Sequence, residues 1–189
     1  MEYRYGDMKR ACLFLDRDGV INRRPDPERY VRSTKQFILI PEILDVLHLA
    51  KAREYPVVVV TNQRGIAIGS MSQLDVDEIH HMLRTLLAKE GLALLDILVC
   101  PHDDNQHPWR KPNPGMLIEA AKRHDLDLQR SWMVGDHLTD VYAGKAAGCQ
   151  TILVDHDDPE GAADFIAHGI AEVTQILFQH LESCEEPLG

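Results

Sequence analysis

The sequence predicts an α/β fold in which helices cover both faces of a parallel sheet. Short apolar segments typical of strands alternate with segments of helical periodicity along most of the 189 residues. One of them, Val57 to Val60, is apolar at every position, which is typical of a strand buried on both faces. Strands and helices that alternate at this spacing form βαβ units, and these build a doubly wound parallel sheet.

In residues 11–100, the sequence predicts three strands and two helices. An apolar strand covers residues 11–15, and after a polar loop a helix begins at Pro41, a residue favoured in the first helical turn. Pro56 ends this helix before the strand at 57–60. A second, amphipathic helix covers 72–89 and Gly91 ends it, after which a strand is expected at 94–100. The apolar face of this second helix is formed by Leu74, Ile79, Met82, Leu83 and Leu86.

The remaining elements continue the same alternation. Pro114 opens a helix, and a strand at 131–134, a helix at 140–147 and a strand at 151–154 follow. A last helix at about 170–181 closes the domain. We expect residues 1–9 to be a polar leader and residues 10–185 to form one domain, because a chain of this length supports a single full core.

Composition narrows the classes of function. The chain is 44% hydrophobic and 26% charged, as in ordinary globular proteins. Its net charge of −10 argues against a nucleic-acid partner, although local basic groups can still bind one small phosphorylated molecule. No apolar stretch is long enough to span a membrane, and the N-terminus lacks the apolar core of a signal peptide. We therefore expect a cytoplasmic protein with no membrane partner, and we favour a monomer.

Polar side chains follow four predicted strands, and we expect them to form one site. Ligands of doubly wound sheets bind beyond the carboxyl ends of the strands. Each of the groups alone is typical of a turn or a helix cap, but four together at strand ends indicate a shared function. The groups are Asp16 and Asp18, then Thr61 with Asn62 and Gln63, then Arg110 with Lys111, and finally Asp136 with Asp140.

These residue types suit the hydrolysis of a phosphate monoester. That reaction needs a nucleophile, a proton donor for the leaving alcohol and cations that offset the phosphoryl charge. Asp16 can act as the nucleophile, and Asp18 as the acid and later the base. The Thr61 hydroxyl can bind phosphoryl oxygens, while Lys111 neutralises both Asp16 and the phosphate. Asp136 completes an oxygen site of the kind that Mg²⁺ prefers.

Four segments, at residues 14–22, 61–66, 110–116 and 135–140, carry a resemblance to a known family. Their sequences, FLDRDGVIN, TNQRGI, RKPNPGM and GDHLTD, are similar to the motifs of the haloacid dehalogenase (HAD) superfamily. Within it, the chain most resembles the branch of the D-glycero-D-manno-heptose-1,7-bisphosphate phosphatases and histidinol-phosphate phosphatases. The resemblance spans about residues 11–155. It implies a Rossmann-like fold without a large cap domain, Mg²⁺ dependence and an aspartyl-phosphate intermediate.

The resemblance also implies roles for the four acidic residues. Asp16 would be the nucleophile and Asp18 the general acid and base. Mg²⁺ would be bound by the Asp16 side chain, the Asp18 backbone carbonyl and the Asp136 side chain. Asp140 would support Lys111 or the water molecules on the metal.

The phosphorylated small-molecule substrate would be bound by residues from two loops. The resemblance implies phosphate contacts from Thr61, Asn62 and Lys111, and a substrate contact from Arg110. Only the helix and loop between Gln63 and Arg110 could cover the site, so we expect an open pocket.

The loop after the third strand departs from the family pattern. Relatives commonly carry a zinc site there, formed by Cys-x-His and a later Cys-x-Cys. This chain keeps Cys100 and His102, but its later pair is replaced by a segment that begins with His107. These three residues, with Asp103 or a water molecule, could bind zinc, whereas a structural zinc site has four protein ligands. We favour a metal-free loop that is ordered by its prolines and by packing of Trp109.

A second departure from the family pattern leaves more than one substrate possible. Arg64 stands where the heptose bisphosphatases usually carry serine, and Ile68 stands where an arginine is expected. A heptose bisphosphate is the leading prediction, and histidinol phosphate or another sugar phosphate is the alternative. A nucleic-acid 3′-phosphatase is a further alternative, although the acidic charge and the lack of a basic aromatic groove count against it. A non-catalytic binding module would be expected to have lost Asp16, Asp18 or Lys111.

Five other basic residues are expected to lie outside the chemistry. His80 and His81 fall on a mostly solvated helix. Arg23 and Arg24 could face the pocket from the loop after the first strand, but we favour a solvated charge pair. His137 neighbours Asp136, but we assign it no catalytic role.

Overall fold

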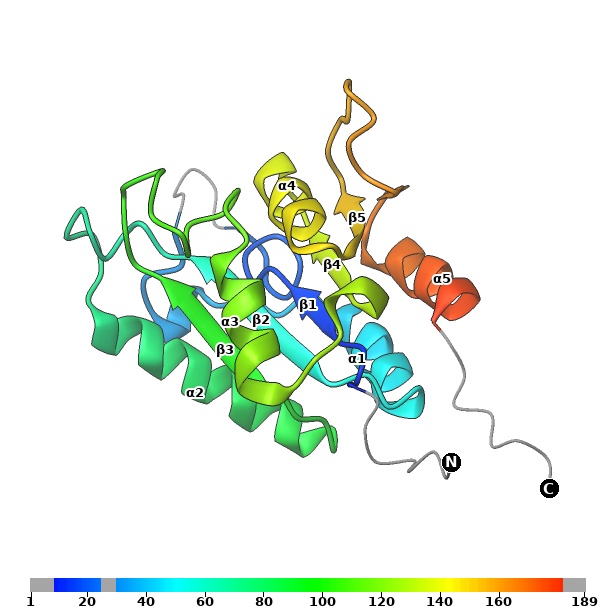
Figure 1. Ribbon diagram of the computed structural model, residues 1–189. Coiled ribbons are helices and arrows are strands. Elements are labelled where there is room, and N and C mark those ends of the chain that lie inside the picture. Colours follow the sequence, from blue (N-terminus) through cyan, green and yellow to red (C-terminus); the bar gives the residue numbers. More distant parts are fainter. Residues whose placement is uncertain (1–8, 25–29, 182–189) are drawn as a thin grey trace.

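A six-stranded parallel sheet forms the centre of the computed structural model, which describes residues 9–24 and 30–181 (Figure 1). The order across the sheet is β3-β2-β1-β4-β5-β6, and every neighbouring pair is parallel. The chain first builds outward from β1 to β3 and then crosses back to β4, so the strand order reverses between β1 and β4. In such folds the ligand crevice lies at this reversal. The strands are β1 Leu13–Leu15, β2 Val57–Asn62, β3 Asp96–Cys100, β4 Trp132–Gly135, β5 Gln150–Val154 and β6 Phe165–Ala167.

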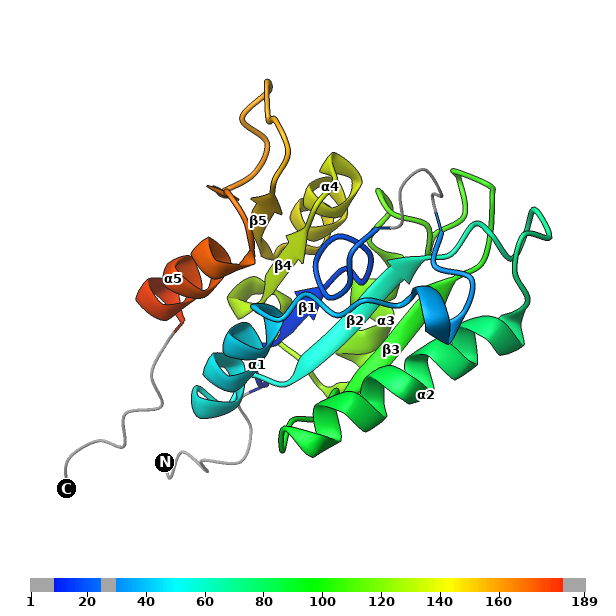
Figure 2. The same ribbon diagram turned by 180° about the vertical axis from the view of Figure 1, so that it is seen from behind.

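Helices cover both faces of the sheet, as predicted. The helices α1 (Ile43–Ala52), α2 (Gln73–Lys89) and α5 (Ile170–His180) pack on one face, seen in front in Figure 2. The helices α3 (Gly115–His124) and α4 (Leu138–Ala147) pack on the other face, seen in front in Figure 1. Side chains alternate along β1, so Leu13 and Leu15 join the first core and Phe14 joins the second. Two short 3₁₀ helices, η1 (Thr34–Gln36) and η2 (Leu128–Arg130), complete the described elements.

Helix α2 begins where the sequence predicts and buries most of the predicted face, with Leu74 as the exception. Ser72 caps it, since its hydroxyl accepts a hydrogen bond from the Asp75 amide at 3.2 Å and Asp75 accepts one from the Ser72 amide at 2.7 Å. Leu74 was predicted to be buried but is 66% exposed. The prediction was wrong there because the face that packs on the sheet follows the helical spacing of Val76, Ile79, His80, Leu83 and Leu87.

The other differences are at element ends. Strand β2 continues through Thr61 and Asn62, α1 begins at Ile43 rather than Pro41, and α4 begins at Leu138. Strand β6 was not predicted, because it is a three-residue edge strand with a partly exposed surface and carries little apolar pattern. Between the strands, the described residues contain no second sheet or cap domain. Of the predicted polar leader, residues 1–8 lie outside the described residues. No helix among those that the structure describes is long and apolar enough to cross a membrane.

Candidate active site

Three carboxylates meet at the carboxyl ends of β1 and β4. Asp16 directly follows β1, Asp136 directly follows β4, and Asp140 lies in the first turn of α4. Each offers an oxygen atom that lies within 4.8 Å of the other two. Asp16 and Asp140 are buried, and Asp136 is half-buried. The fold therefore brings Asp16 together with two predicted site residues, Asp136 and Asp140, that lie far from it in the sequence.

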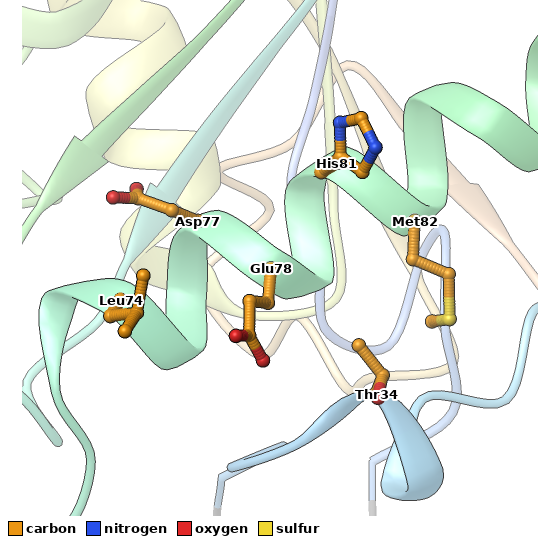
Figure 3. Close-up of a pocket in the computed structure, with 6 residues that line it drawn as sticks. All are labelled: Thr34, Leu74, Asp77, Glu78, His81 and Met82. Atoms are coloured by element: carbon orange, nitrogen blue, oxygen red, sulfur yellow. The ribbon is translucent and has the colours of Figure 1, made fainter.

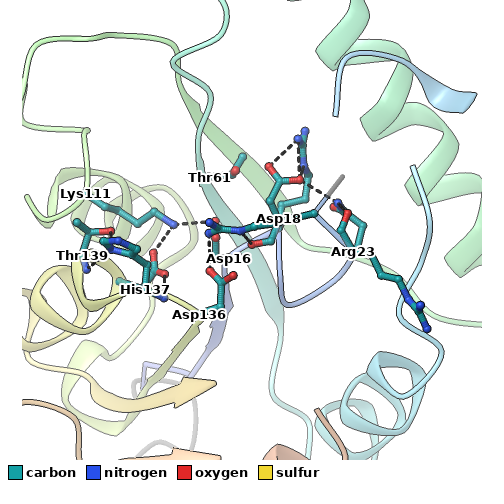
Figure 4. Close-up of polar contacts among 12 residues, drawn as sticks. Asp16, Asp18, Arg23, Thr61, Lys111, Asp136, His137 and Thr139 are labelled. Atoms are coloured by element: carbon teal, nitrogen blue, oxygen red, sulfur yellow. Dashed lines mark hydrogen bonds and ion pairs between the residues drawn. The ribbon is translucent and has the colours of Figure 1, made fainter. Parts of the chain in front are cut away.

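Lys111 reaches into this cluster from the loop between β3 and α3 (Figure 4). Its Nζ lies 2.8 Å from Asp16 Oδ1, 2.6 Å from Asp140 Oδ1 and 2.8 Å from the Val60 carbonyl oxygen. Burial alone would lower the pKa of Lys111, but Asp140 and Asp16 hold that pKa above its usual value. Lys111 therefore remains a buried cation whose three protons are all donated.

Asn62 holds the backbone of Lys111. Its amide group donates to the Lys111 carbonyl at 3.0 Å and accepts from the Lys111 amide at 3.1 Å. The Asn62 amide nitrogen keeps a second hydrogen, which could still contact a phosphate as predicted. The arrangement accounts for an asparagine at the end of β2 as a support for Lys111.

Asp18 faces a different set of partners from Asp16. Arg17, Asn22 and Gln63 donate hydrogen bonds to its two carboxylate oxygens, and Gln63 also donates to the Thr61 hydroxyl at 2.8 Å. Burial alone would raise the pKa of Asp18, but Arg17 first, and then Asn22 and Gln63, hold that pKa below its usual value. Asp18 is therefore ionised and closely held.

The cluster around Asp16 has the electrostatics of a cation site. Burial, reinforced by neighbouring carboxylates, raises the pKa of Asp16 to about 6 and that of Asp136 to about 7. Gly19 fits closely behind Asp136: its φ is +92°, and a Cβ atom there would lie 1.7 Å from Asp136 Oδ2. An all-oxygen set of carboxylates that repel one another suits a hard divalent cation such as Mg²⁺.

Arg24 covers this cluster with a half-exposed side chain, so it follows the alternative of facing the pocket and not the favoured one of a solvated charge pair. Its Nη2 lies 2.7 Å from Asp136 Oδ1, and its Nε donates to the Asp18 carbonyl oxygen at 3.3 Å. Arg23 points away from the carboxylates (Figure 4). The favoured prediction was wrong for Arg24 because the loop after β1 folds back over the strand ends, and no local pattern in the sequence announces that path.

His80 is also placed differently from the prediction. It is buried on α2, where its Nε2 lies 3.2 Å from Nη1 of the fully buried Arg17. His81 is exposed, as predicted, and lines a surface pocket of about 470 Å³ between α2 and η1 (Figure 3). None of the predicted site residues lines this pocket.

The loop over residues 100–110 is held by hydrogen bonds and packing. Its residues Cys100, His102 and His107 are not a metal-ligand group in the described part of the chain. The two histidine rings stack at 3.8 Å, and His107 Nδ1 accepts a hydrogen bond from the Trp109 amide. Trp109 packs against the second core and under the Arg123 guanidinium. This geometry gives no support to a zinc site.

Two arginines border the same loop. Arg110 donates to the His102 carbonyl oxygen at 2.8 Å and to Asn105 at 2.9 Å, and Arg64 forms an ion pair with Asp103. His137, the residue before α4, accepts a hydrogen bond from the Thr139 amide and so caps the helix. The rim beside the carboxylates thus carries basic groups from loops that follow β2 and β3.

The chain is similar in sequence to known phosphatases of one family. The profile of the HAD-hydrolase-like family matches residues 108–173. A D-glycero-β-D-manno-heptose-1,7-bisphosphate 7-phosphatase from Mesorhizobium japonicum is 44% identical over 153 residues, which are 76% of this chain and 69% of that protein. A D-glycero-α-D-manno-heptose-1,7-bisphosphate 7-phosphatase from Mycobacterium bovis is 39% identical over 160 residues, 81% of this chain and 84% of its own.

A solved structure extends the similarity to three dimensions. The D,D-heptose 1,7-bisphosphate phosphatase from B. bronchiseptica, crystallised in complex with magnesium and phosphate, superposes with a TM-score of 0.78 at 33% identity. The match covers 89% of this chain and 98% of that one.

Proposed function

We propose that this chain removes the 7-phosphate of a D-glycero-D-manno-heptose 1,7-bisphosphate. The chain belongs to the HAD-like hydrolases and is a phosphoric monoester hydrolase of the heptose-bisphosphate phosphatase family. The observation that carries the proposal is the buried contact between Asp16 and Lys111, with Asp18 beside it at the end of β1. A carboxylate held against a buried ammonium, next to a second carboxylate, has the parts that phosphoryl transfer needs. The relatives named for this substrate support the choice of a heptose over histidinol phosphate.

In the first step, Asp16 attacks phosphorus and the bond between phosphorus and the C7 oxygen breaks. Lys111 holds Oδ1 of Asp16, so Oδ2 is the oxygen that attacks. Asp18 rests ionised, and the negative charge of the arriving phosphate raises its pKa, so that it takes up a proton from solvent. It then gives this proton to the leaving C7 oxygen.

In the second step, water hydrolyses the aspartyl phosphate. Asp18, now a carboxylate again, takes a proton from the attacking water as the bond between phosphorus and Asp16 breaks. Inorganic phosphate leaves, Asp18 releases the proton that it took from water to the solvent, and both aspartates are carboxylates again. The Thr61 hydroxyl, beside Gln63, is our candidate for a phosphate ligand during both steps.

We further propose that Mg²⁺ binds between the Asp16 side chain, the Asp18 backbone carbonyl and the Asp136 side chain. The raised pKa values of Asp16 and Asp136 support this, because each carboxylate is destabilised in its ionised form without a cation. When bound, the ion would neutralise charge on the phosphoryl oxygens. Asp140 supports the site by holding Lys111 in place. Its Oδ1 forms an ion pair with Lys111, and its Oδ2 accepts a hydrogen bond from the His137 amide at 3.1 Å.

The rim of the site supports a substrate with a second anionic group. We propose that Arg64 and Arg110 contact the end of the substrate remote from the transferred phosphate. Both are held by residues of the 102–105 segment, Arg110 by the His102 carbonyl oxygen and Asn105, and Arg64 by the Asp103 carboxylate. A phosphate group is a stronger partner for the Arg110 guanidinium than these neutral groups. The relatives are named for both anomers, so the anomer that this chain prefers is part of the test.

The test is phosphate release with and without Mg²⁺. The substrates are the α and β anomers of the heptose 1,7-bisphosphate, histidinol phosphate and an oligonucleotide with a 3′-phosphate. We expect Mg²⁺-dependent turnover of a heptose bisphosphate, and we expect Asp16→Asn to be folded and inactive. Preference for histidinol phosphate or for the oligonucleotide would replace the proposed substrate, and normal turnover by Asp16→Asn would refute the mechanism. The cytoplasmic location and the monomeric state stay predictions.

A further inference from the structure

The residue between the two catalytic aspartates is buried and points at one of them. Arg17 has no solvent exposure, although arginine is among the residues most rarely buried. Its Nη2 lies 2.8 Å from Asp18 Oδ2 and 3.1 Å from Oδ1, and its Nε lies 3.2 Å from Oδ1. The guanidinium therefore holds both oxygens of one carboxylate, which fixes the plane of that carboxylate as well as its position.

The far side of the guanidinium is held by His80. Nη1 of Arg17 lies 3.2 Å from His80 Nε2, and the two groups come from the loop after β1 and from α2. A guanidinium has only donors, so Nε2 must be the acceptor and the ring must be neutral. Burial, and then the charge of Arg17, lowers the pKa of His80 to about 4, in agreement with a neutral ring.

We propose that Arg17 and His80 are positioning residues that aim the Asp18 carboxylate at the leaving oxygen of the substrate. The inference rests on the proposed function, in which Asp18 transfers the proton. Asn22 donates to Oδ1 of Asp18 at 2.9 Å and Gln63 donates to Oδ2 at 3.0 Å, so each of them holds one oxygen. Among the described residues, Arg17 alone holds both oxygens with one rigid group, and His80 accepts a hydrogen bond from the opposite end of that group.

Through the contact between His80 and Arg17, helix α2 helps to position the Asp18 carboxylate. The helix follows the loop that continues from β2, and it carries His80 on its buried face, where a hydrophobic residue would be the ordinary occupant. Proton transfer depends steeply on the direction of the donor, so a carboxylate free to rotate would transfer its proton less often. Buried polar contacts that cost desolvation are more readily explained by such a requirement than by stability.

The experiment compares two substrates that differ in their need for an acid. The heptose bisphosphate has a poor leaving group, whereas p-nitrophenyl phosphate releases a stable phenolate without protonation. We would measure kcat/KM, which includes only the steps up to the first irreversible one, formation of the aspartyl phosphate. The variants are His80→Leu, which removes the acceptor, and His80→Gln, whose amide oxygen can replace Nε2. His81→Leu, an exposed neighbour on the same helix, is the matched control.

We expect His80→Leu to lower kcat/KM for the heptose bisphosphate about tenfold, a part of the ~10²–10⁴-fold that general acid catalysis supplies. Its kcat/KM for p-nitrophenyl phosphate should change less than about twofold, and His80→Gln should restore most of the loss. His81→Leu should match the wild type on both substrates.

An equal loss on both substrates would mean that His80 is merely structural, and no loss on either would also overturn the inference. If His80→Leu fails to fold, Arg17→Lys, which keeps the charge but loses the fork, takes its place with the same expected selectivity. Failure of the proposed function gives a different result, since either the wild type would then not release phosphate from the heptose bisphosphate, or Asp16→Asn would keep its activity, whatever happens at His80.

Discussion

Replacing Lys111 by methionine would remove the only cation that contacts Asp16 and Asp140 in the described structure. The methionine fills much of the same volume, so the main change is electrostatic. Two carboxylates that are 9% and 2% exposed would lose their partner, and the Val60 carbonyl would lose its donor. The substitution therefore leaves buried charge uncompensated.

The loss of stability follows from that burial. Removing one partner of a buried ion pair costs about 3–5 kcal/mol, because the remaining charge stays desolvated. For a domain of this size, 1 kcal/mol corresponds to a Tm shift of about 2–4 °C, so we expect Lys111→Met to lower Tm by about 6–20 °C. The control is Lys145→Met, which breaks the half-exposed ion pair with Asp164 and should cost less than about 1 kcal/mol.

The assay is thermal unfolding of the metal-free proteins at several pH values. Lys111 lowers the pKa of Asp16, so its removal raises a folded-state pKa that burial has already lifted to about 6. A carboxyl whose folded pKa is raised loses stability as pH rises through that pKa, so the deficit of the variant should be larger at about pH 8 than at about pH 5. A deficit as small as that of Lys145→Met, or one that shrinks with rising pH, would refute the reasoning.

Three further predictions concern the carboxylate cluster. Arg24→Gln should bind Mg²⁺ more tightly in calorimetric titration, because the guanidinium on Asp136 no longer competes with the ion; weaker binding would count against this. In the absence of metal, the Tm of the wild type should fall relative to the Tm of Asp136→Asn as the pH rises from about 4 to about 7, because the pKa of Asp136 in the folded protein is raised to about 7. A difference in Tm between the two proteins that does not change with pH would contradict the raised pKa. Gly19→Ala should lower both Tm and Mg²⁺ affinity, because its Cβ atom overlaps Asp136 Oδ2 and its backbone has φ +92°; a neutral result would show that the loop adjusts freely.

Much of the fold could be predicted because each element carries its own signal. The apolar run at Val57 to Val60 identified a central strand, and Ser72 marked the start of α2. Strand β6 was missed because three residues at a sheet edge carry too little pattern to detect. Leu74 was assigned to the wrong face because the side of a helix that packs is decided by tertiary contacts.

The candidate site was predictable in part for a related reason. Parallel strands bring their carboxyl ends to one edge, so Asp16, Lys111 and Asp136 could be grouped from their places in the sequence alone. Arg24 and His80 could not be assigned in the same way. Each meets its partner through the path of a loop or the rotation of a helix, and neither leaves a mark on the local sequence.

The proposed mechanism requires that Asp16 becomes phosphorylated during turnover. The most direct test mixes the Mg²⁺-loaded protein with a heptose bisphosphate carrying ³²P in its 7-phosphate and quenches the reaction in acid within one turnover. We predict protein-bound label that is released by base, maps by mass spectrometry to the peptide containing Asp16, and is absent from Asp16→Asn. Release of labelled phosphate with no protein-bound label at any quench time, or label on another residue, would contradict the account.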